Sequence, residues 1–431
     1  MSGGAPLILI ERDAALPLIH GGICTRSGAG DDPVGLEGLT RLCGRLMRRT
    51  AGGHGADEVD ARIDRMGASL GLDSGHGSTA LSGSVLERSF GDFMGLLEEI
   101  LTAPGLHEQE LERLKRETLA ELIEILDSDQ QLAQRWFLRS LFAGHSYGRT
   151  VIGTQDSLAA IQVADVRRCY ERHFTRENLL FSFAGAVDLD QAARAVESIW
   201  AALPPGGGRA SDPPPEPVAA GGRRLIFVDK PERTQTQILI GGLGAHPNDQ
   251  DYFPLLVANT VFGGTFTARL THEVRAKRGW SYGAYSSLGY DRRRQAFSMW
   301  TFPKAEDAAP CIALELEMLS EWWERGVTEQ ELGWSKRYLA QSQAFSCDTA
   351  AKRVGMKLDE ILSDLPAGHH DEFVARVSAV TLEETNRAIQ NRISLDHLTV
   401  VVVGTHDLIG DGVREAIPKL GSDRIVPFDT E

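Results

Sequence analysis

The chain of 431 residues is long enough to bury more than one hydrophobic core, and with 42% hydrophobic and 24% charged residues its composition is that of a globular protein. Its 45 basic and 60 acidic residues give a net charge of −15, which would repel phosphate backbones and weighs against nucleic-acid binding. No stretch approaches the roughly 20 apolar residues of a membrane helix, and no leader-like segment is evident. We therefore expect a cytoplasmic protein with neither a nucleic-acid nor a membrane partner.

The first predicted elements are a strand over residues 16–25 and a helix from Pro33 onward. Proline suits a first helical turn, and Asp31 and Asp32 beside it would cap the helix and complement its dipole. A strand over 80–86 and a helix over 90–101 come next, followed by an amphipathic helix over 108–125. The first of these helices is predicted from apolar residues at helical spacing, namely Leu36, Leu39, Leu42 and Leu46.

Prolines and glycines then fill residues 204–222, which cannot belong to a regular helix or strand. We interpret this stretch as a linker between a first half, residues 1–203, and a second half, residues 223–431. The elements predicted for the second half are a strand over 235–242, a helix over 252–262, and a strand pair over 283–290 and 296–301.

The two halves resemble one another at two places in the same order. Residues 105–111, followed by Lys115-Arg116, match residues 326–332, followed by Lys336-Arg337. Residues 179–185 match residues 398–404, and an aspartate follows each stretch at the same offset. Ordered matches of this kind indicate an internal duplication. Because strands stand beside helices without regular β-α-β alternation, the predicted class is α+β, with each half a layered sandwich of mainly antiparallel sheet flanked by helices.

The stretch Gly35–Leu42 resembles the metal-binding helix of the pitrilysin/insulysin-type (inverzincin) zinc metallopeptidase family, whose pattern is Gly-x-Ala-His-x-x-Glu-His. In this chain Gly38 and Leu42 stand at the histidine positions and Arg41 stands at the general-base position. Glycine and leucine side chains offer no lone pair to Zn²⁺, and arginine stays protonated. We therefore expect no metal in this chain.

Two further observations bear on a metal site. The twelve histidines include no pair at i and i+4, so the sequence supplies no substitute for the lost ligands. Glu121 and Asp127 match the family's later Glu-x-x-x-x-x-Asp pattern, which carries its third ligand. Without the histidines we expect Glu121 to have an ordinary surface or network role. The five cysteines, Cys24, Cys43, Cys169, Cys311 and Cys347, are scattered and lack a Cys-x-x-Cys pair, so we interpret them as buried or incidental thiols.

A second signature in the later half is retained. Gly263-Gly264 and Arg269-Leu270, followed by Arg275, Gly279 and Tyr282, resemble the family's Gly-Gly-x-x-x-Ser-Arg-Leu and Arg-x-Lys-x-Gly-x-x-Tyr motifs. Gly279 can end a helix in the left-handed conformation, so that Arg275 and Tyr282 face one groove. The residue types alone favour a basic helix terminus and a packed aromatic side chain. The resemblance implies that Arg275 and Tyr282 bind a substrate carbonyl and the oxyanion that forms from it.

The resemblance as a whole implies the non-catalytic subunit of a heterodimeric clamshell peptidase. Zinc is then expected only in a homologous partner subunit, Arg275 and Tyr282 act in that partner's site on a peptide substrate, and the chain alone is inactive. The alternative is a peptide-binding or assembly scaffold with no proteolytic role. A third possibility, a serine hydrolase, rests on Gly279-Trp280-Ser281-Tyr282-Gly283, but the flanking elements are the reverse of those that a nucleophile elbow requires.

Overall fold

The structure is a computed structural model that describes residues 5–206, 212, 214–219 and 221–430. The chain divides into two compact units. No helix among the described residues is both long and apolar enough to cross a membrane. Unit 1 comprises Met1–Leu122, Arg149–Pro214 and Phe345–Ala367, and unit 2 comprises Ile123–Gly148, Pro215–Ala344 and Gly368–Glu431.

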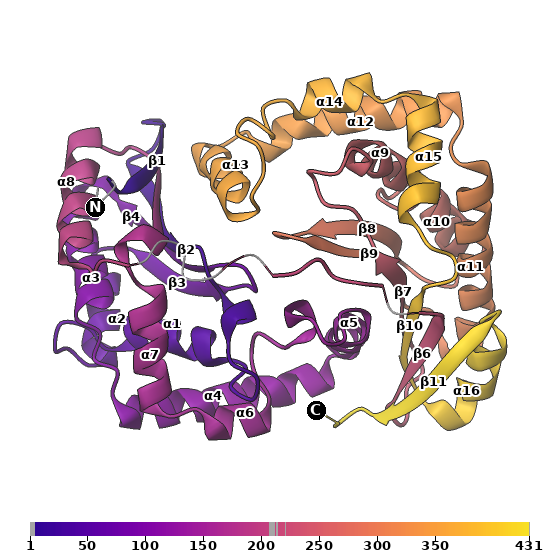
Figure 1. Ribbon diagram of the computed structural model, residues 1–431, viewed down its shortest axis with the longest axis horizontal. Helices are drawn as coiled ribbons and strands as arrows, with labels where there is room; N and C mark the ends of the chain where they lie inside the picture. The colour runs from indigo at the N-terminus through magenta and orange to yellow at the C-terminus, as the bar shows by residue number, and fades with distance from the viewer. Residues whose placement is uncertain (1–4, 207–211, 213, 220, 431) are drawn as a thin grey trace. The chain divides into compact units, whose positions relative to one another are not determined.

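Unit 1 is built on a five-stranded sheet in the order β1-β5-β2-β4-β3 (Figure 1). Only β1 and β5 pair in parallel, and the other three pairs are antiparallel. The strands are β1 (Leu7–Arg12), β2 (Leu18–Thr25), β3 (Ser69–Ser74), β4 (Thr79–Leu86) and β5 (Leu179–Gly185). The helices are α1 (Leu39–Arg49), α2 (Ala56–Arg65), α3 (Phe90–Thr102), α4 (Glu108–Asp127), α6 (Gln155–Ala160), α7 (Val163–His173), α8 (Leu189–Ala202) and α13 (Ala350–Leu362).

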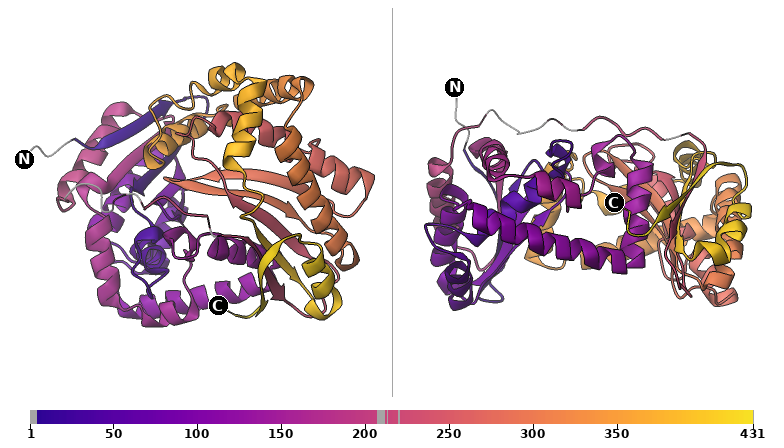
Figure 2. Two further views of the ribbon diagram at one scale, coloured as in Figure 1. Left: turned by 45° about the vertical axis from the view of Figure 1, so that its right-hand side comes forward. Right: turned by 90° about the horizontal axis from the view of Figure 1, so that it is seen from below.

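Unit 2 is built on a six-stranded sheet in the order β11-β6-β10-β7-β9-β8. The strand β11 lies at one edge of this sheet, next to β6 (Figures 1 and 2). The strands are β6 (Arg223–Asp229), β7 (Gln237–Leu243), β8 (Ala284–Tyr290), β9 (Arg294–Thr301), β10 (Thr399–Gly404) and β11 (Leu420–Pro427). The helices are α5 (Asp129–Leu141), α9 (Tyr252–Phe262), α10 (Arg269–Thr271), α11 (Ala308–Arg325), α12 (Glu329–Ser346), α14 (Phe373–Ala379), α15 (Leu382–Arg392) and α16 (His406–Glu415).

The two sheets repeat one topology. When β1, β5, β2, β4 and β3 are matched with β6, β10, β7, β9 and β8, the strand order is the same, and β11 is the strand that unit 2 adds. The first matched pair of strands is parallel in both units and the remaining pairs are antiparallel. The expected α+β fold with two duplicated, mainly antiparallel halves is therefore confirmed.

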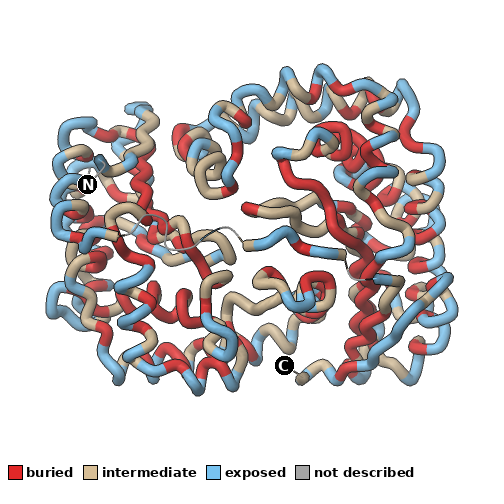
Figure 3. Tube along the Cα trace, viewed as in Figure 1, coloured by how far each residue is buried: buried red, intermediate tan, exposed pale blue. Residues whose placement is uncertain are grey.

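Helices cover both faces of the unit 2 sheet, and the alternation of side chains along the strands separates two cores. Ile238 and Ile240 of β7 belong to the core on which α9, α11 and α15 pack. Leu239, between them, belongs to the other core, where Trp136 and Phe137 of α5 are buried. Figure 1 shows α5 and α11 on opposite sides of β7 and β10, and Figure 3 shows the buried strands between helices whose outer faces are exposed.

Unit 1 has a corresponding covering helix. Ala350 and Val354 of α13 form a buried cluster with Ala184 of β5, and Leu9 of β1 packs against it. Glu11 of β1 also pairs with α13 through Arg353 at 2.9 Å and Lys357 at 3.2 Å. Each unit therefore has one sheet-covering helix whose sequence lies in the other half of the chain: α5 follows α4, and α13 follows α12.

The structure differs from the expectation in two respects. The first helix begins at Leu39 and not at Pro33, because Gly35 and Gly38 have positive φ values of 86° and 94° that a continuing α-helix cannot adopt. The compact units also differ from the expected halves, residues 1–203 and 223–431. Residues 123–148 of the first half belong to unit 2, and residues 345–367 of the second half belong to unit 1. In the expected linker, the described residues 204–206, 212, 214–219 and 221–222 form no helix or strand, and residues 207–211, 213 and 220 lie outside the described part.

Candidate functional site

The backbone at Gly38 leaves no room for the histidine that the family carries there. Gly38 is the N-cap of α1, and a Cβ atom at this position would lie 2.8 Å from the carbonyl oxygen of Ile152. Asp32 satisfies the free amides of this helix start by accepting hydrogen bonds at 3.0 Å from the Gly38 and Thr40 nitrogens. The expected capping role of Asp32 is therefore present, although the helix starts later than expected.

The other two altered positions of the motif are built into the structure of unit 1. Leu42 is 1% exposed and belongs to the apolar core. Arg41 donates to Glu121 of α4 at 2.6 Å, and Arg45, one turn further along α1, donates to the other oxygen of the same carboxylate at 2.7 Å. Arg49, a further turn on, binds Glu117 at 3.0 Å. A ladder of ion pairs between α1 and α4 thus occupies the face where the family's ligands would meet.

This geometry does not suit zinc. Glu121 has both carboxylate oxygens engaged by guanidinium groups, and the remaining altered positions carry no metal-binding atom. Within the described ranges, no three His, Cys, Asp or Glu side chains are grouped so that they could hold a metal ion. Sequence reasoning noted Glu121 but missed its partner Arg45, although the i, i+4, i+8 spacing of Arg41, Arg45 and Arg49 is visible in the sequence.

Arg275 and Tyr282 lie on either side of a helix end in unit 2. Residues His272–Lys277 continue α10 as a π-helix, a rare form that is frequent at functional sites. Gly279, with φ of 66°, ends it: its amide bonds to the Arg275 carbonyl at 3.1 Å, and the next amide bonds to the Val274 carbonyl at 3.1 Å. Tyr282 lies two residues before the first residue of β8, close to its predicted position at the start of the strand.

The glycine turn before this helix allows α9 to pack closely against β8 in unit 2. A Cβ atom on Gly263 would lie 2.6 Å from the Ser286 amide nitrogen, and one on Gly264 would lie 2.9 Å from the Thr260 Cα. The Gly263 carbonyl accepts from the Ser286 amide at 2.9 Å. The buried Ser286 hydroxyl donates to Asn259 Oδ1 of α9 at 2.6 Å. These contacts hold the turn from which the Arg275 helix starts.

The charges at this helix end are not equivalent. Lys277 and Arg278 both pair with Glu273, and these two cations hold the pKa of the Glu273 carboxyl below its usual range through hydrogen bonds. Arg275 has no carboxylate within 4.0 Å among the described residues. Its guanidinium carbon instead lies 4.1 Å from the ring centroid of Phe266 and 4.5 Å from that of Tyr282. Arg275 is thus held between two aromatic rings by cation–π contacts.

The aromatic rings that hold Arg275 are accessible. Tyr282 is 74% exposed and Phe266 is 56% exposed, whereas Arg275 between them is half-buried. The motif's other arginine, Arg269, has a structural role, because it forms a two-pronged ion pair with Glu331 of α12 at 2.5 and 2.7 Å. The structure therefore distinguishes one available cation, Arg275, from three that are neutralised. Phe266 is a member of this site that sequence reasoning missed, because its distance of nine residues from Arg275 fits no helical or strand repeat.

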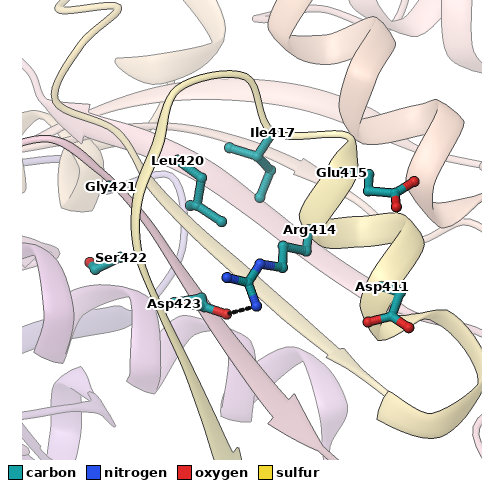
Figure 4. Close-up of a pocket in the computed structure, with 8 residues that line it drawn as sticks. All are labelled: Asp411, Arg414, Glu415, Ile417, Leu420, Gly421, Ser422 and Asp423. Atoms are coloured by element: carbon teal, nitrogen blue, oxygen red, sulfur yellow. Dashed lines mark ion pairs between the residues drawn. The ribbon is translucent and has the colours of Figure 1, made fainter.

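Two other features do not form an active site. Ser281, the serine of the Gly-x-Ser-x-Gly stretch, is buried, donates to the Gly283 carbonyl at 2.6 Å and accepts from the Phe302 amide at 3.1 Å. A hollow of about 440 Å³ lies between α16 and β11, where Arg414 reaches across to pair with Asp423 at 3.0 Å (Figure 4). Arg275 and Tyr282 do not line this hollow.

Comparisons with known proteins agree with this geometry. The model of the insulinase family, peptidase family M16, matches residues 8–155, and the model of the peptidase M16 inactive domain matches residues 160–339. The chain is 22% identical over 398 residues to a non-peptidase homolog, YmxG, of Helicobacter pylori, covering 92% of this chain and 91% of the relative. It is 24% identical over 393 residues to an uncharacterized zinc protease of Streptomyces coelicolor, covering 89% and 84%.

The fold also matches a solved structure. The crystal structure of a peptidase M16 inactive domain from Pseudomonas fluorescens superimposes with a TM-score of 0.84 at 23% sequence identity, covering 92% of this chain and 95% of that one. Two models of one family together match most of the chain, and the residues at the position of the metal site carry a salt-bridge ladder in place of ligands. The chain belongs to the M16 peptidase family, as an inactive homologue.

Proposed function

We propose that this chain is the non-catalytic subunit of a two-chain peptidase, in which a homologous subunit carries the zinc site. In this proposal Arg275 and Tyr282 bind the peptide substrate in the partner's site. The observation that carries it is the state of Arg275: an unpaired cation held between two exposed rings, next to cations that are all paired.

The chemistry of these side chains supports a role in transition-state binding. A guanidinium group and a phenol both donate hydrogen bonds, and both could donate to the carbonyl oxygen of a scissile peptide bond as it gains negative charge. Stacking between Phe266 and Tyr282 restricts the rotamers of Arg275 before substrate arrives, which lowers the entropy lost on binding. An ion pair with a carboxylate would have to be broken first, and Arg275 has none in the described part of the chain.

The experiment has two steps. The tagged chain is purified from its source cells, and co-purifying proteins are examined for an M16 homologue with an intact His-x-x-Glu-His. The reconstituted pair is then assayed on a fluorogenic peptide with Arg275→Ala, Tyr282→Phe and, as a control, Arg325→Ala, whose exposed arginine pairs with Glu321 of the same helix, α11. We expect kcat to fall about 10²- to 10³-fold for Arg275→Ala, less for Tyr282→Phe, and not at all for the control.

The alternative function, a peptide-binding or assembly scaffold, is favoured by the designation of the Helicobacter pylori relative as a non-peptidase homolog. The same experiment separates the two functions. A pair whose turnover is unchanged in both site variants, although assembly is intact, would contradict the proposed role of Arg275 and Tyr282. Peptide binding without any hydrolysis by the complex would establish the scaffold.

A further inference from the structure

Unit 1 contains a second group of reactive side chains that the proposed function does not use. Cys43 of α1 and Cys169 of α7 are 126 residues apart in sequence, and both are buried. The Cys43 sulfur lies 3.7 Å from the carbonyl oxygen of Val166, one turn before Cys169. The Cys169 sulfur lies 3.8 Å from the hydroxyl of Thr40, one turn before Cys43. The two cysteines therefore occupy the same contact between α1 and α7.

The two thiols are electrostatically coupled. Hydrogen bonding from Cys43 and from His173 holds the pKa of Cys169 below its usual range, although burial opposes the shift. Hydrogen bonding with Cys169 and burial raise the pKa of Cys43. Cys169, whose pKa is lowered and which lines a hollow, is therefore suited to attack, and Cys43, whose pKa is raised and which does not line it, is suited to resolve.

A chain of polar groups orients His173 behind Cys169. The His173 Nδ1 atom is 2.5 Å from the Ser27 hydroxyl, and that hydroxyl accepts from Asn178 Nδ2 at 2.9 Å. Because Asn178 donates a hydrogen bond to the Ser27 oxygen, the Ser27 hydroxyl is free to donate a hydrogen bond to His173 Nδ1. With Nδ1 accepting from Ser27, Nε2 is the ring nitrogen of His173 that is left to hydrogen-bond with Cys169.

The pair has a route to solvent. A hollow of about 170 Å³ is lined by Cys169 and His173 and by charged side chains, among them Asp165, Arg168 and Arg172. Cys169 is 5% exposed, whereas Cys43 behind it is not exposed. A hydroperoxide is small enough to reach Cys169 through such an opening, and larger alkylating reagents are hindered. The arrangement therefore favours a small oxidant over a larger reagent, and it favours reaction of Cys169 before Cys43.

We propose that Cys43 and Cys169 are a redox-active dithiol pair: a small hydroperoxide oxidises Cys169, and Cys43 then converts the product to a disulfide. In the first step the Cys169 sulfur attacks one peroxide oxygen, the O–O bond breaks, and the hydroxide that leaves takes up the thiol's proton as water. In the second step the Cys43 sulfur displaces hydroxide from the sulfenic acid of Cys169. The S–O bond breaks, the S–S bond forms, and the proton of Cys43 leaves in a second water.

The other cysteines provide internal controls. Cys24 in β2 and Cys311 in α11 are buried without a second thiol beside them, and burial raises the pKa of Cys24 to about 12 and also raises that of Cys311. Both should therefore remain reduced. Cys347 is only partly buried, so Cys347→Ser removes the thiol that could form disulfides between molecules.

The experiment treats the folded full-length Cys347→Ser protein with hydrogen peroxide, quenches with acid, and alkylates the remaining thiols after unfolding. Four thiols remain in this variant, five cysteines minus one. We expect two alkyl groups per molecule after peroxide and four before it, with a Cys43–Cys169 peptide pair that dithiothreitol separates. In the Cys43→Ser background, a 1,3-dicarbonyl probe added while the peroxide-treated protein is unfolded should label Cys169; in Cys169→Ser, every remaining thiol should stay alkylatable.

Three outcomes would overturn the proposal: four alkylated thiols after peroxide, oxidation that falls on Cys24 or Cys311, or probe labelling of Cys43 in Cys169→Ser with no labelling of Cys169 in Cys43→Ser. Circular dichroism before and after treatment establishes that the reacting protein is folded. If either serine variant fails to fold, the peptide map of the Cys347→Ser protein decides alone, because its Cys24 and Cys311 are controls within the same molecule.

Discussion

Glu315 of α11 brings an ionisable side chain into the apolar core of unit 2. It is 0% exposed, and neither carboxyl oxygen has a hydrogen-bond partner within 3.5 Å in the described structure. Burial raises the pKa of Glu315 to about 8, and the nearby Thr301 hydroxyl offsets only part of that rise. At neutral pH the folded protein therefore holds this group largely protonated.

The pH dependence of stability follows from this shift. Because the folded-state pKa lies above the unfolded value, the folded state binds one more proton between about pH 4.5 and 8, so the free energy of unfolding falls by up to about 1.4 kcal/mol per pH unit in that window. Glu315→Gln removes this proton uptake. We expect the stability of the variant relative to the wild type to grow by roughly 3 kcal/mol from pH 5 to pH 8, measured by urea unfolding.

A matched control lies on the same helix. Glu321→Gln alters an exposed glutamate of α11 that pairs with Arg325, and it should leave the pH profile of the wild type unchanged. Parallel pH profiles for Glu315→Gln and the wild type would show that Glu315 is ionised in the folded protein, contrary to the burial argument.

At the scale of single elements, α1 shows how the metal site was lost. The three side chains account for the missing chemistry, and the start of the helix and its partners on α4 also do not suit a metal site. Gly38 has a backbone conformation that disfavours any side chain, Leu42 is in the core, and Arg45 faces Glu121 from the next turn. The site is therefore occupied by a different set of interactions.

This leads to a prediction about reversion. The triple variant Gly38→His, Arg41→Glu and Leu42→His should not retain zinc after dialysis, as measured by elemental analysis. It should also be less stable than the wild type by more than about 2 kcal/mol, because it combines a clash at position 38, buried polar groups at 42 and a carboxylate facing Glu121.

The single variant Gly38→Ala separates the backbone effect from the ligands. It should lower stability by about 1–2 kcal/mol on its own, because φ is 94° and the Ile152 carbonyl is close. Stoichiometric zinc in a triple variant that melts like the wild type would refute the view that the new packing prevents metal binding.

Elements with a strong local signal could be predicted from the sequence. The helix Tyr252–Phe262 has the predicted bounds, because its apolar run is bounded by a polar turn and by Gly263-Gly264. The start of α1 could not be predicted by periodicity alone: Leu36 continues the apolar pattern, but Gly35 and Gly38 adopt positive φ, and Gly38 packs against residues 152–153. The contact that decides the boundary is more than a hundred residues away.

At the scale of the whole molecule, each compact unit depends on a helix from the other half of the chain. Leu132, Trp136 and Phe137 of α5 are buried in unit 2, and Ala350 and Val354 of α13 are buried in unit 1. These helices follow α4 and α12, which are the helices that the two matching sequence stretches begin. The architecture is therefore that of two duplicated halves, each of which contributes one helix, α5 or α13, to the compact unit of the other.

The exchange predicts that the halves do not fold alone. Residues 1–203 expressed without the rest should expose the apolar face of α5 and the uncovered face of their sheet, and residues 223–431 should lack the cover that α5 provides. We expect each to bind a hydrophobic dye strongly and to melt without cooperativity, whereas co-expression should give a soluble complex with the melting curve of the intact chain.

The control for that experiment is the intact chain cleaved at a protease site inserted in residues 204–222, which should keep its melting curve while the fragments stay associated. A half that is monomeric, melts cooperatively and does not bind dye would contradict the exchange.

The sequence by itself determined two properties of the chain. The residue types at positions 38, 41 and 42 cannot bind zinc whatever their surroundings, and the two repeated stretches indicate a duplicated fold. Tertiary structure alone decided which of several nearby cations is available, since Lys277 and Arg278 pair with Glu273 whereas Arg275 lies against Tyr282. It also decided that Cys43 meets Cys169 and that α5 and α13 change places. Such contacts join residues far apart in the chain, and they leave no periodic pattern because packing selects them through shape and burial and not through local backbone preference.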